Sequence, residues 1–331
     1  MKAMVLTHTA QIETEPLRLM KMPEPIPGAR EVRIKVAACG ICRTDLHVIE
    51  GELPMHTMPI IPGHQAAGVI DAIGESVARF KIGDRAGVMW MHETCGVCSY
   101  CKSGNENLCD QARFTGYDAM GGYAEYVTVQ ERFACKIPQG FDDLHAAPLL
   151  CAGIIGYRSY RLSGAKPGCR LGLYGFGASA HITLQVAIHA GCDAYVFTRN
   201  PRHQALAKSL GAIWTGESKD RPSASMDASI IFAPAGELVP EALAALKKGG
   251  TVALAGIYMT PIPEMSYELI YGERILRSVA NATVQDAEEL LALAPQIPIK
   301  TEIETYPLDQ ANKALRILKE SRHQGAGVLI I

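Results

Sequence analysis

Four cysteines lie close together in one segment of the chain: Cys95, Cys98, Cys101 and Cys109. Spacings this short let the thiolates converge on one tetrahedral ion, and four protein ligands leave no coordination position for water or substrate. The segment therefore predicts a structural zinc site. An iron–sulfur cluster uses the same ligand type, but nothing else in the sequence indicates an electron carrier.

A second group of potential metal ligands is dispersed and consists of Cys42, His64 and Cys151. Two thiolates and one imidazole would leave a fourth position for water or substrate, which is the arrangement of catalytic zinc. Spacing alone does not join these residues. A single histidine beside a glycine, as in Gly63-His64, is more often structural than a metal ligand.

A glycine-rich turn lies near the middle of the chain, as Gly175-Phe-Gly177-Ala-Ser-Ala180. It follows an apolar run at residues 170–174 and opens a stretch with helical periodicity at residues 178–190. In such a unit the first glycine permits the tight turn, and the second lets the backbone approach a pyrophosphate at the helix N-terminus. Alanine is accepted at the third position. We interpret the turn as a dinucleotide site rather than a structural glycine turn.

The residues after the next predicted strand bear on the choice of cofactor. An NAD site usually places a carboxylate there to bind the ribose hydroxyls, whereas this chain has Thr198-Arg199-Asn200. No carboxylate would repel a 2′-phosphate, and the Arg199 guanidinium can pair with one. The sequence therefore favours NADP(H). The alternative is that Arg199 is a solvated side chain and that NAD(H) binds through other contacts.

The bulk composition is that of an ordinary soluble globular protein. The 331 residues are 48% hydrophobic and 20% charged, with a formal net charge of −2, and this length predicts about two domains. No basic stripe indicates a nucleic acid or an anionic membrane as partner. The first residues lack the features of a signal peptide, and no apolar run is long enough to span a bilayer. We therefore expect a cytoplasmic protein, in which clustered cysteines bind metal rather than form disulfides.

The elements that must position these residues follow two patterns. Over the first 150 residues or so, short β-like runs alternate with turns, which indicates a partly open β-barrel with long loops. Beyond that point strands and helices alternate, which is typical of a parallel sheet covered on both faces. The β-like runs of the first part include residues 32–36, 67–73 and 123–129. The later strands are expected at residues 170–174, 194–197, 228–232 and 251–255, and the helices at residues 178–190, 204–210 and 238–246.

The last part of the chain is expected to rejoin the first domain. From about residue 290 the pattern predicts a helix, a strand at residues 300–305, a second helix and a final strand at residues 328–331.

Several motifs occur in a fixed order along nearly the whole chain. The run Cys-Gly-Ile-Cys-Arg-Thr-Asp-Leu-His occupies residues 39–47, Pro-Gly-His ends at His64, and the four-cysteine segment follows. Pro-Leu-Leu-Cys-Ala-Gly then occupies residues 148–153, before the glycine-rich turn. With this combination the chain resembles the zinc-containing alcohol dehydrogenases of the medium-chain dehydrogenase/reductase superfamily.

The resemblance implies an α/β fold with two domains and two zinc ions per chain. A GroES-like β-rich catalytic domain would comprise residues 1–153 and 290–331, and a Rossmann domain with a doubly wound parallel sheet would comprise residues 154–289. By the same resemblance Cys42, His64 and Cys151 bind a catalytic zinc ion, and the four clustered cysteines bind a structural one.

The resemblance also gives roles to four neighbouring residues. Thr44 is similar to the hydroxyl that accepts the proton of the substrate alcohol, and His47 to the base that passes it to solvent through the cofactor ribose. Asp45 is similar to the carboxylate that orients the zinc-binding histidine, and Arg43 to the residue that contacts the pyrophosphate. The alternatives are a helix N-cap for Thr44, a solvated helix position for His47 and a capping partner for Asp45.

One position departs from the family pattern. The family usually has glutamate after the zinc-binding histidine, where this chain has Gln65. Gln65 cannot supply an anion that approaches the metal, as some proposals for the family require. Because two thiolates already neutralise Zn²⁺, we expect the loss of a nearby carboxylate to help a bound alcohol ionise.

The expected activity is reversible hydride transfer between a primary or small secondary alcohol and NAD(P)⁺, with a small-molecule alcohol or aldehyde as substrate. A polyol or sugar dehydrogenase of the same superfamily and a non-catalytic, zinc-stabilised NADP(H)-binding protein are the alternatives. A homo-oligomer, either a dimer or a tetramer, is expected. The pocket is expected to be apolar, and its candidate lining residues, any of which can equally belong to the core, are Ile49, Leu53, Trp90, Tyr258 and Met259.

Overall fold

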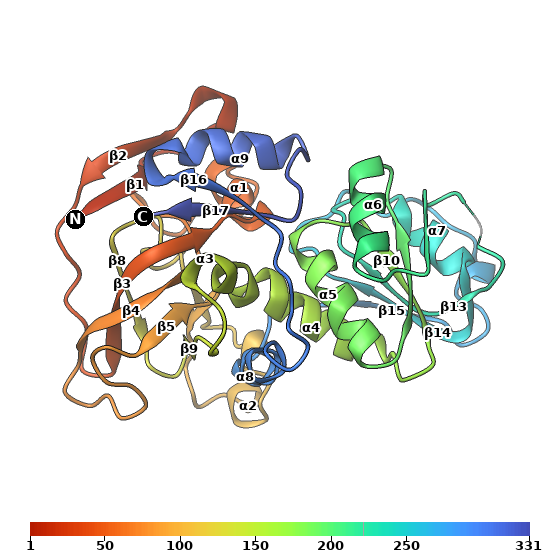
Figure 1. Ribbon diagram of the computed structural model, residues 1–331, viewed down its shortest axis with the longest axis horizontal. Helices are drawn as coiled ribbons and strands as arrows, with labels where there is room; N and C mark the ends of the chain where they lie inside the picture. Colours follow the sequence, from red (N-terminus) through yellow and green to blue (C-terminus); the bar gives the residue numbers. More distant parts are fainter. Residues whose placement is uncertain (221) are drawn as a thin grey trace. The chain divides into compact units, whose positions relative to one another are not determined.

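The computed structural model describes residues 1–220 and 222–331. Its contacts divide the chain into two compact units. Unit 1 comprises Met1–Cys151, Asn281–Gln296 and Lys300–Ile331, and unit 2 comprises Ala152–Ala280 and Ile297–Ile299. Figure 1 shows unit 1 mainly in red to yellow and in blue, and unit 2 in green to cyan. Unit 1 is therefore built from both ends of the chain.

A seven-stranded sheet forms the centre of unit 1, in the order β16-β17-β3-β4-β5-β9, with β8 also paired to β3. The long central strand is β3 (Glu31–Gly40). One of its edges pairs with β4 (Gln65–Ile73), and the other is shared by β8 (Tyr126–Gln130) and β17 (Ala326–Ile330). Buried and less buried residues alternate along the first part of β3, as expected for a strand with one face in the core.

The other strands of unit 1 are β1 (Lys2–Leu6), β2 (Leu17–Lys21), β5 (Arg85–Val88), β6 (Met91–Glu93), β7 (Arg113–Phe114), β9 (Ala134–Lys136) and β16 (Ile303–Pro307). Its helices are α1 (Arg43–Glu50), α2 (Ser99–Lys102), α3 (Asp143–Ala146), α8 (Val284–Leu293) and α9 (Ala311–Lys319), with short 3-10 turns that include η2 (Glu106–Leu108) and η3 (Ala147–Leu150).

Unit 2 contains a six-stranded parallel sheet in the order β12-β11-β10-β13-β14-β15. Its strands are β10 (Arg170–Tyr174), β11 (Asp193–Phe197), β12 (Trp214–Gly216), β13 (Met226–Ile231), β14 (Leu246–Leu254) and β15 (Ile275–Ser278), and its helices are α4 (Ala152–Ser163), α5 (Ala178–His189), α6 (Pro201–Ser209) and α7 (Leu238–Ala244).

Helices cover both faces of the unit 2 sheet. Leu173 of β10 lies in one buried cluster with Leu184 of α5, whereas the next residue, Tyr174, lies in a second cluster with Val239 of α7. Because neighbouring side chains of a strand point to opposite faces, the two clusters are the cores on the two sides of the sheet. This arrangement confirms the predicted doubly wound α/β fold.

Two helices begin earlier than predicted from the sequence, because capping residues set their first turns. The helix expected at residues 204–210 begins at Pro201, because the Asn200 side chain accepts the amide of Arg202 at 2.9 Å and proline suits a first helical position. The helix expected from about residue 290 begins at Val284, because Thr283 and Asp286 form a buried capping box.

The start of α8 also bears on the domain boundary. Residues 281–289 are predicted to belong to the Rossmann domain, whereas the contacts place them in unit 1. The amide of Val284 donates to Glu106 Oε1 at 2.9 Å, and this bond joins the start of α8 to η2 of unit 1. Among the described residues, no helix has the length and apolar character needed to cross a membrane.

Candidate active site and metal centres

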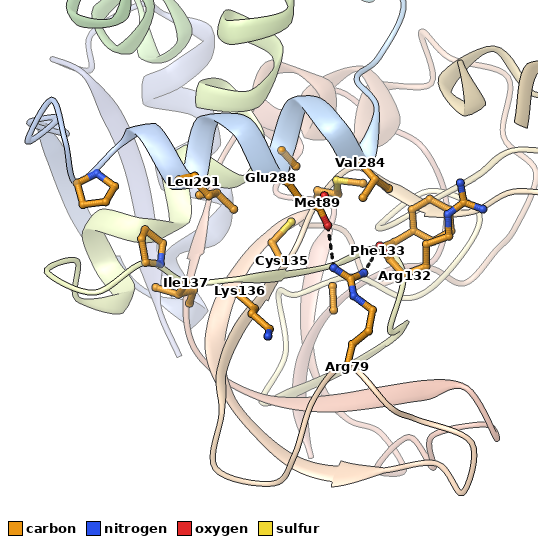
Figure 2. A pocket seen from close by; sticks show the side chains of 15 residues that line it. Arg79, Met89, Arg132, Phe133, Cys135, Lys136, Ile137, Val284, Glu288 and Leu291 are labelled. Carbon is orange, nitrogen blue, oxygen red and sulfur yellow. Dashed lines mark hydrogen bonds and ion pairs between the residues drawn. The ribbon is translucent and has the colours of Figure 1, made fainter. Parts of the chain in front are cut away.

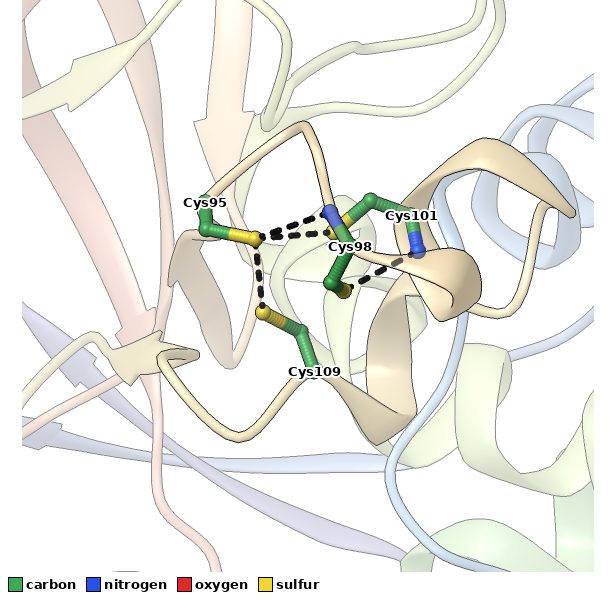
Figure 3. Close-up of side chains that lie close together, drawn as sticks. All are labelled: Cys95, Cys98, Cys101 and Cys109. Carbon is green, nitrogen blue, oxygen red and sulfur yellow. Dashed lines mark hydrogen bonds between the residues drawn. The ribbon is translucent and has the colours of Figure 1, made fainter.

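The four clustered cysteines converge in one loop after β6. Their sulfur atoms lie within 4.8 Å of one another, and Figure 3 shows Cys95, Cys98, Cys101 and Cys109 pointing toward a common centre. The amide of Cys98 donates to Cys95 Sγ at 3.3 Å. Amide hydrogen bonds from Val97 and Cys98 lower the pKa of Cys95 to about 6. The loop thus offers four sulfur ligands and backbone donors that favour thiolate, which fits a closed tetrahedral zinc site.

The dispersed ligands also converge, although they come from three separate segments. Cys42 is the N-cap of α1, His64 lies directly before β4, and Cys151 follows η3. One ligand atom from each lies within 4.8 Å of the others, and His64 Nε2 is 3.2 Å from Cys151 Sγ. A hydrogen bond from Cys151 and the nearby His64 lower the pKa of Cys42 well below its usual value, although burial opposes this. This donor set fits a zinc ion with one open position.

A buried carboxylate orients the imidazole of this set. His64 and Asp45 are at most 2% exposed, and His64 Nδ1 is 2.9 Å from Asp45 Oδ1. The other carboxylate oxygen, Asp45 Oδ2, accepts the amide of Cys42 at 2.8 Å and the hydroxyl of Tyr123 at 3.0 Å. A neutral ring that donates from Nδ1 to Asp45 would present the Nε2 lone pair to the ligand set. Asp45 therefore acts both as a capping partner of α1 and as a partner of His64.

Tyr123 is a member of this network that the sequence analysis did not single out. Its side chain is fully buried, and burial together with the Asp45 charge raises the pKa of Tyr123 well above its usual value, so the phenol stays a donor. Gly63, directly before His64, has a φ of +92°, and a side chain there would collide with the Tyr123 ring. The only signal in the sequence was an aromatic residue at the start of a β-like run.

Helix α1 carries the other candidate catalytic residues. The Sγ atom of Cys42 is 3.7 Å from Thr44 Oγ1, and Cys42 rather than Thr44 is the N-cap. His47 is one turn further along and is 6% exposed, so it is not a solvated helix position. Its Nδ1 pairs with Glu52, whose side chain is 39% exposed. Thr44 therefore lies at the ligand set, and the His47–Glu52 pair reaches toward solvent.

Two further residues near the ligand set have defined surroundings. The guanidinium of Arg43 donates to Ser321 Oγ at 3.2 Å and to the Lys319 carbonyl at 3.4 Å, so the end of α9 holds it. Gln65 is 2% exposed and begins β4. A side chain added at Gly40 would meet Gln65 at 3.1 Å, which places Gln65 across from β3.

The glycine-rich turn has the local geometry of a dinucleotide site. Gly175 follows β10 with a φ of +86°, which favours glycine. Gly177 is the N-cap of α5, and a Cβ added there would meet nothing within 4 Å. Ala180, in the first turn of α5, is fully buried. The open N-terminus of α5 can therefore accept a pyrophosphate.

The two residues after β11 differ in their exposure. Thr198 is 9% exposed, and its amide donates to the Gly216 carbonyl at 2.7 Å. Arg199 is exposed. Both lie at the carboxyl end of a strand beside the phosphate-binding turn, where dinucleotides bind in such sheets.

The five candidate pocket residues do not form one group. The ring of Trp90 meets the His64 imidazole edge-on, with 4.9 Å between centroids, and stacks on Phe114 at 5.0 Å. Leu53 is half-buried after α1, and Ile49 is fully buried within it. In unit 2, Met259 packs against the α7-side core, and Tyr258 is exposed. The structure thus brings Trp90 to the ligand set and places Ile49 in the core.

An apolar cavity of about 360 Å³ lies apart from these residues, between α8 and β9 of unit 1. Figure 2 shows Cys135, Ile137 and Leu291 in its lining and the ion pair of Arg79 with Glu288 at its side. None of the buried polar atoms without a hydrogen-bond partner, among the described residues, belongs to this lining. The lining is mainly apolar, and its charged side chains are those of Arg79, Arg132, Lys136 and Glu288.

Comparison with known proteins gives matches along the chain. The family model described as alcohol dehydrogenase GroES-like domain matches residues 28–139, and that described as zinc-binding dehydrogenase matches residues 180–296. The chain is 47% identical to the probable alcohol dehydrogenase AdhA of Mycobacterium tuberculosis, over 100% of this chain and 97% of that protein. It is 32% identical to an alcohol dehydrogenase of Geobacillus stearothermophilus, over 95% of this chain and 96% of that protein.

Two solved structures match nearly the whole chain. A cinnamyl alcohol dehydrogenase from Sorghum bicolor has a TM-score of 0.90 and 29% identity, with 99% of this chain and 97% of that chain covered. An enzyme described as CAD from Helicobacter pylori, complexed with NADP(H), has a TM-score of 0.88 and 25% identity, with 100% of this chain and 99% of that chain covered.

Proposed function

Because this chain belongs to the zinc-containing alcohol dehydrogenases of the medium-chain dehydrogenase/reductase superfamily, we propose that Cys42, His64 and Cys151 form its catalytic zinc centre and that NADP(H) is its preferred cofactor. The chain is an NAD(P)-dependent alcohol dehydrogenase, and the cofactor carries the hydride. The observation that carries the proposal for the centre is the convergence of three ligand atoms from three separate segments.

The proposed centre divides the chemistry between the metal and the protein. A zinc ion held by these residues would lower the pKa of a bound alcohol or polarise a bound carbonyl. Asp45 holds the His64 ring through Nδ1, and Tyr123 and the Cys42 amide hold Asp45 in turn. The four clustered cysteines would bind a second zinc ion, whose role is structural because every position is filled by protein.

Thr44 and His47 form the proposed route for the alcohol proton. The Thr44 hydroxyl lies beside Cys42, where it can accept the proton of an alcohol held at the centre. His47 would take the proton onward toward solvent, and its contact with the partly exposed Glu52 supports this exit.

The nucleotide is proposed to bind at the turn Gly175 to Gly177 and the N-terminus of α5, with Arg43 as a further pyrophosphate contact. Thr198 and the exposed Arg199 support NADP(H), because a hydroxyl and a guanidinium replace the carboxylate that would repel a 2′-phosphate. A charge-assisted contact contributes about 1.5–3 kcal/mol, which corresponds to roughly 10- to 100-fold in affinity.

This cofactor preference predicts the outcome of one substitution. We expect wild type to have the higher kcat/KM with NADP⁺, and Thr198→Asp to reverse the order by restoring the repelling carboxylate. The measurement is kcat/KM for both cofactors with one alcohol. A wild type that prefers NAD⁺ about tenfold, the low end of the same contact energy, contradicts the proposal and leaves Arg199 as a surface residue.

The substrate is proposed to be a primary or small secondary alcohol with an apolar body. The Trp90 ring contacts the His64 imidazole, and Leu53 follows the helix that carries Thr44 and His47. These apolar side chains favour such alcohols over polyols and sugars. A panel of ethanol, hexanol, benzyl alcohol and sorbitol with both cofactors tests this. Turnover highest with sorbitol supports the polyol alternative, and binding of NADPH without any turnover supports the non-catalytic one. A cytoplasmic location and a dimeric or tetrameric assembly remain predictions.

A further inference from the structure

A single asparagine side chain joins the four-cysteine loop to the wall of the proposed catalytic centre. Trp90 Nε1 donates to Asn281 Oδ1 at 3.1 Å. Asn281 Nδ2 in turn donates to the Asn107 carbonyl at 3.5 Å, and Asn107 lies two residues before Cys109. The side chain of Asn281 thus contacts both regions of unit 1.

Trp90 is the residue through which this bridge reaches the metal ligands. Its ring meets the His64 imidazole with 4.9 Å between centroids and an interplanar angle of 72°. Phe114 stacks on it at 5.0 Å, and the Tyr117 ring stacks on it at 6.0 Å. These ring contacts fix the plane in which Trp90 lies, but an indole can still slide or turn within a stack. The hydrogen bond at Nε1 removes that freedom, because it has a preferred direction.

Asn281 is itself held at a fixed point of the backbone. Its φ of +54° lies in the left-handed region, which asparagine tolerates better than most residues. Two residues on, Thr283 and Asp286 close the buried capping box of α8, and the Val284 amide bonds to Glu106, which is 3% exposed. The anchor of the Trp90 bond is therefore the rigid start of a helix and not a free loop.

We propose that Asn281 is a positioning residue for the alcohol site: it fixes the Trp90 indole against His64 and couples that wall to the four-cysteine loop. The inference rests on the proposed function, because it assigns Trp90 to the substrate wall. Without Asn281, the indole N–H loses its acceptor and the ring leaves its orientation. An apolar alcohol long enough to reach the wall then loses contact, whereas ethanol is affected less.

The first test uses the tryptophan itself as a reporter. The chain has two tryptophans, Trp90 and Trp214, so Trp214→Phe leaves Trp90 alone. In that background Asn281→Gly, which keeps the positive φ but removes both bonds, should shift the emission of Trp90 and increase its quenching by acrylamide. Asn281→Asp, which keeps an acceptor for Nε1, should restore the wild-type emission. Asn105→Gly is the control, because it makes the same change in the four-cysteine loop, where the Asn105 side chain bonds locally to Ser103.

The second test separates positioning from general stability. With zinc content unchanged, Asn281→Gly should raise KM for hexanol by roughly three- to tenfold, the range of one lost hydrogen bond, with a smaller change in KM for ethanol and in kcat. In a Trp90→Phe background, which lacks the indole donor, Asn281→Gly should have no further effect on KM. If Asn281→Gly does not fold, Trp90→Phe alone should give the same rise for hexanol.

The two readouts also separate this inference from the proposed function. Emission and zinc content can be measured without substrate. If wild type shows no alcohol turnover but Asn281→Gly shows the expected emission shift, the proposed function is refuted and the Asn281–Trp90 bond is supported. An active wild type whose emission and hexanol KM are unchanged by Asn281→Gly refutes the inference. An Asn281→Asp variant that behaves like Asn281→Gly also refutes it.

Discussion

The two sets of potential metal ligands in unit 1 contrast in how they are assembled. The four cysteines come from one loop, and their sulfurs are brought together by α2, η2 and the turns between them. Cys42, His64 and Cys151 come from the end of β3, the start of β4 and the end of η3. The first set is a local structure, whereas the second exists only when the central sheet is in place.

The hydrogen-bond partners of the two sets also differ. Backbone amides donate to the sulfurs of the four-cysteine loop, and Cys95 and Cys98 are partly exposed. Around His64 the partners are buried side chains, Asp45 and Tyr123. The four cysteines form a closed set, which fills every coordination position and needs only to hold its ion. Cys42, His64 and Cys151 form an open set, which must hold its ligands in orientation while one position stays free.

The largest effect should come from the open set. Cys151→Ser should lower kcat/KM by about 1,000-fold or more, because Lewis-acid stabilisation contributes several kcal/mol to the transition state. The variant should lose one of two zinc ions and keep its circular dichroism spectrum. Metal analysis measures the zinc content, and the rate of alcohol oxidation gives kcat/KM. Full metal content in Cys151→Ser would remove this residue from the catalytic set.

The closed set should respond in stability rather than in chemistry. Cys98→Ser should lower Tm and zinc content, because binding of a structural zinc ion contributes directly to folding, while kcat per folded molecule changes little. Thermal unfolding, metal analysis and active-site titration measure these quantities. If kcat per folded molecule falls as far as in Cys151→Ser, the contrast between the two sets does not hold.

The buried partner of His64 should give an intermediate effect. Asp45→Asn keeps an oxygen for the Cys42 amide but removes the charge, and loss of such a partner costs about 10- to 100-fold in metal affinity or activity. Zinc retention under chelator and kcat/KM measure it. As a control, Asp118→Asn changes a carboxylate that contacts His56 and the Phe114 amide, and it should leave zinc retention unchanged.

The smallest effect should come from the proton route. His47→Gln should slow alcohol oxidation by about tenfold. This is less than the usual contribution of a general base, because solvent can replace His47 in part. The decrease should be greatest at low pH, where solvent base is scarce, and added buffer base should restore part of the rate. A pH–rate profile identical to wild type excludes His47 from the route.

The same contrast explains what the sequence could and could not predict. The four cysteines and the turn at Gly175 are local patterns, so their residue types and spacing indicated both sites. The helix starts at Pro201 and Val284 were misplaced, because a cap outweighs the apolar periodicity that was used. The bonds of Tyr123 to Asp45 and of Trp90 to Asn281 join residues 78 and 191 positions apart. No spacing within one sequence predicts such pairs, and the ligand set of Cys42, His64 and Cys151 was joined only by resemblance.

The pairing of β3 has a consequence for how the protein is made. All of the proposed zinc ligands have been synthesised by residue 151, yet β17, which pairs with Ala38, Cys39 and Gly40 just before Cys42, lies at residues 326–330. The ribosome must therefore synthesise β17 before that edge of β3 can close. Unit 2, which is almost continuous in sequence, can fold while unit 1 still lacks its last strand. A nascent chain stalled before β17 would carry every metal ligand and still lack the completed sheet that positions Cys42.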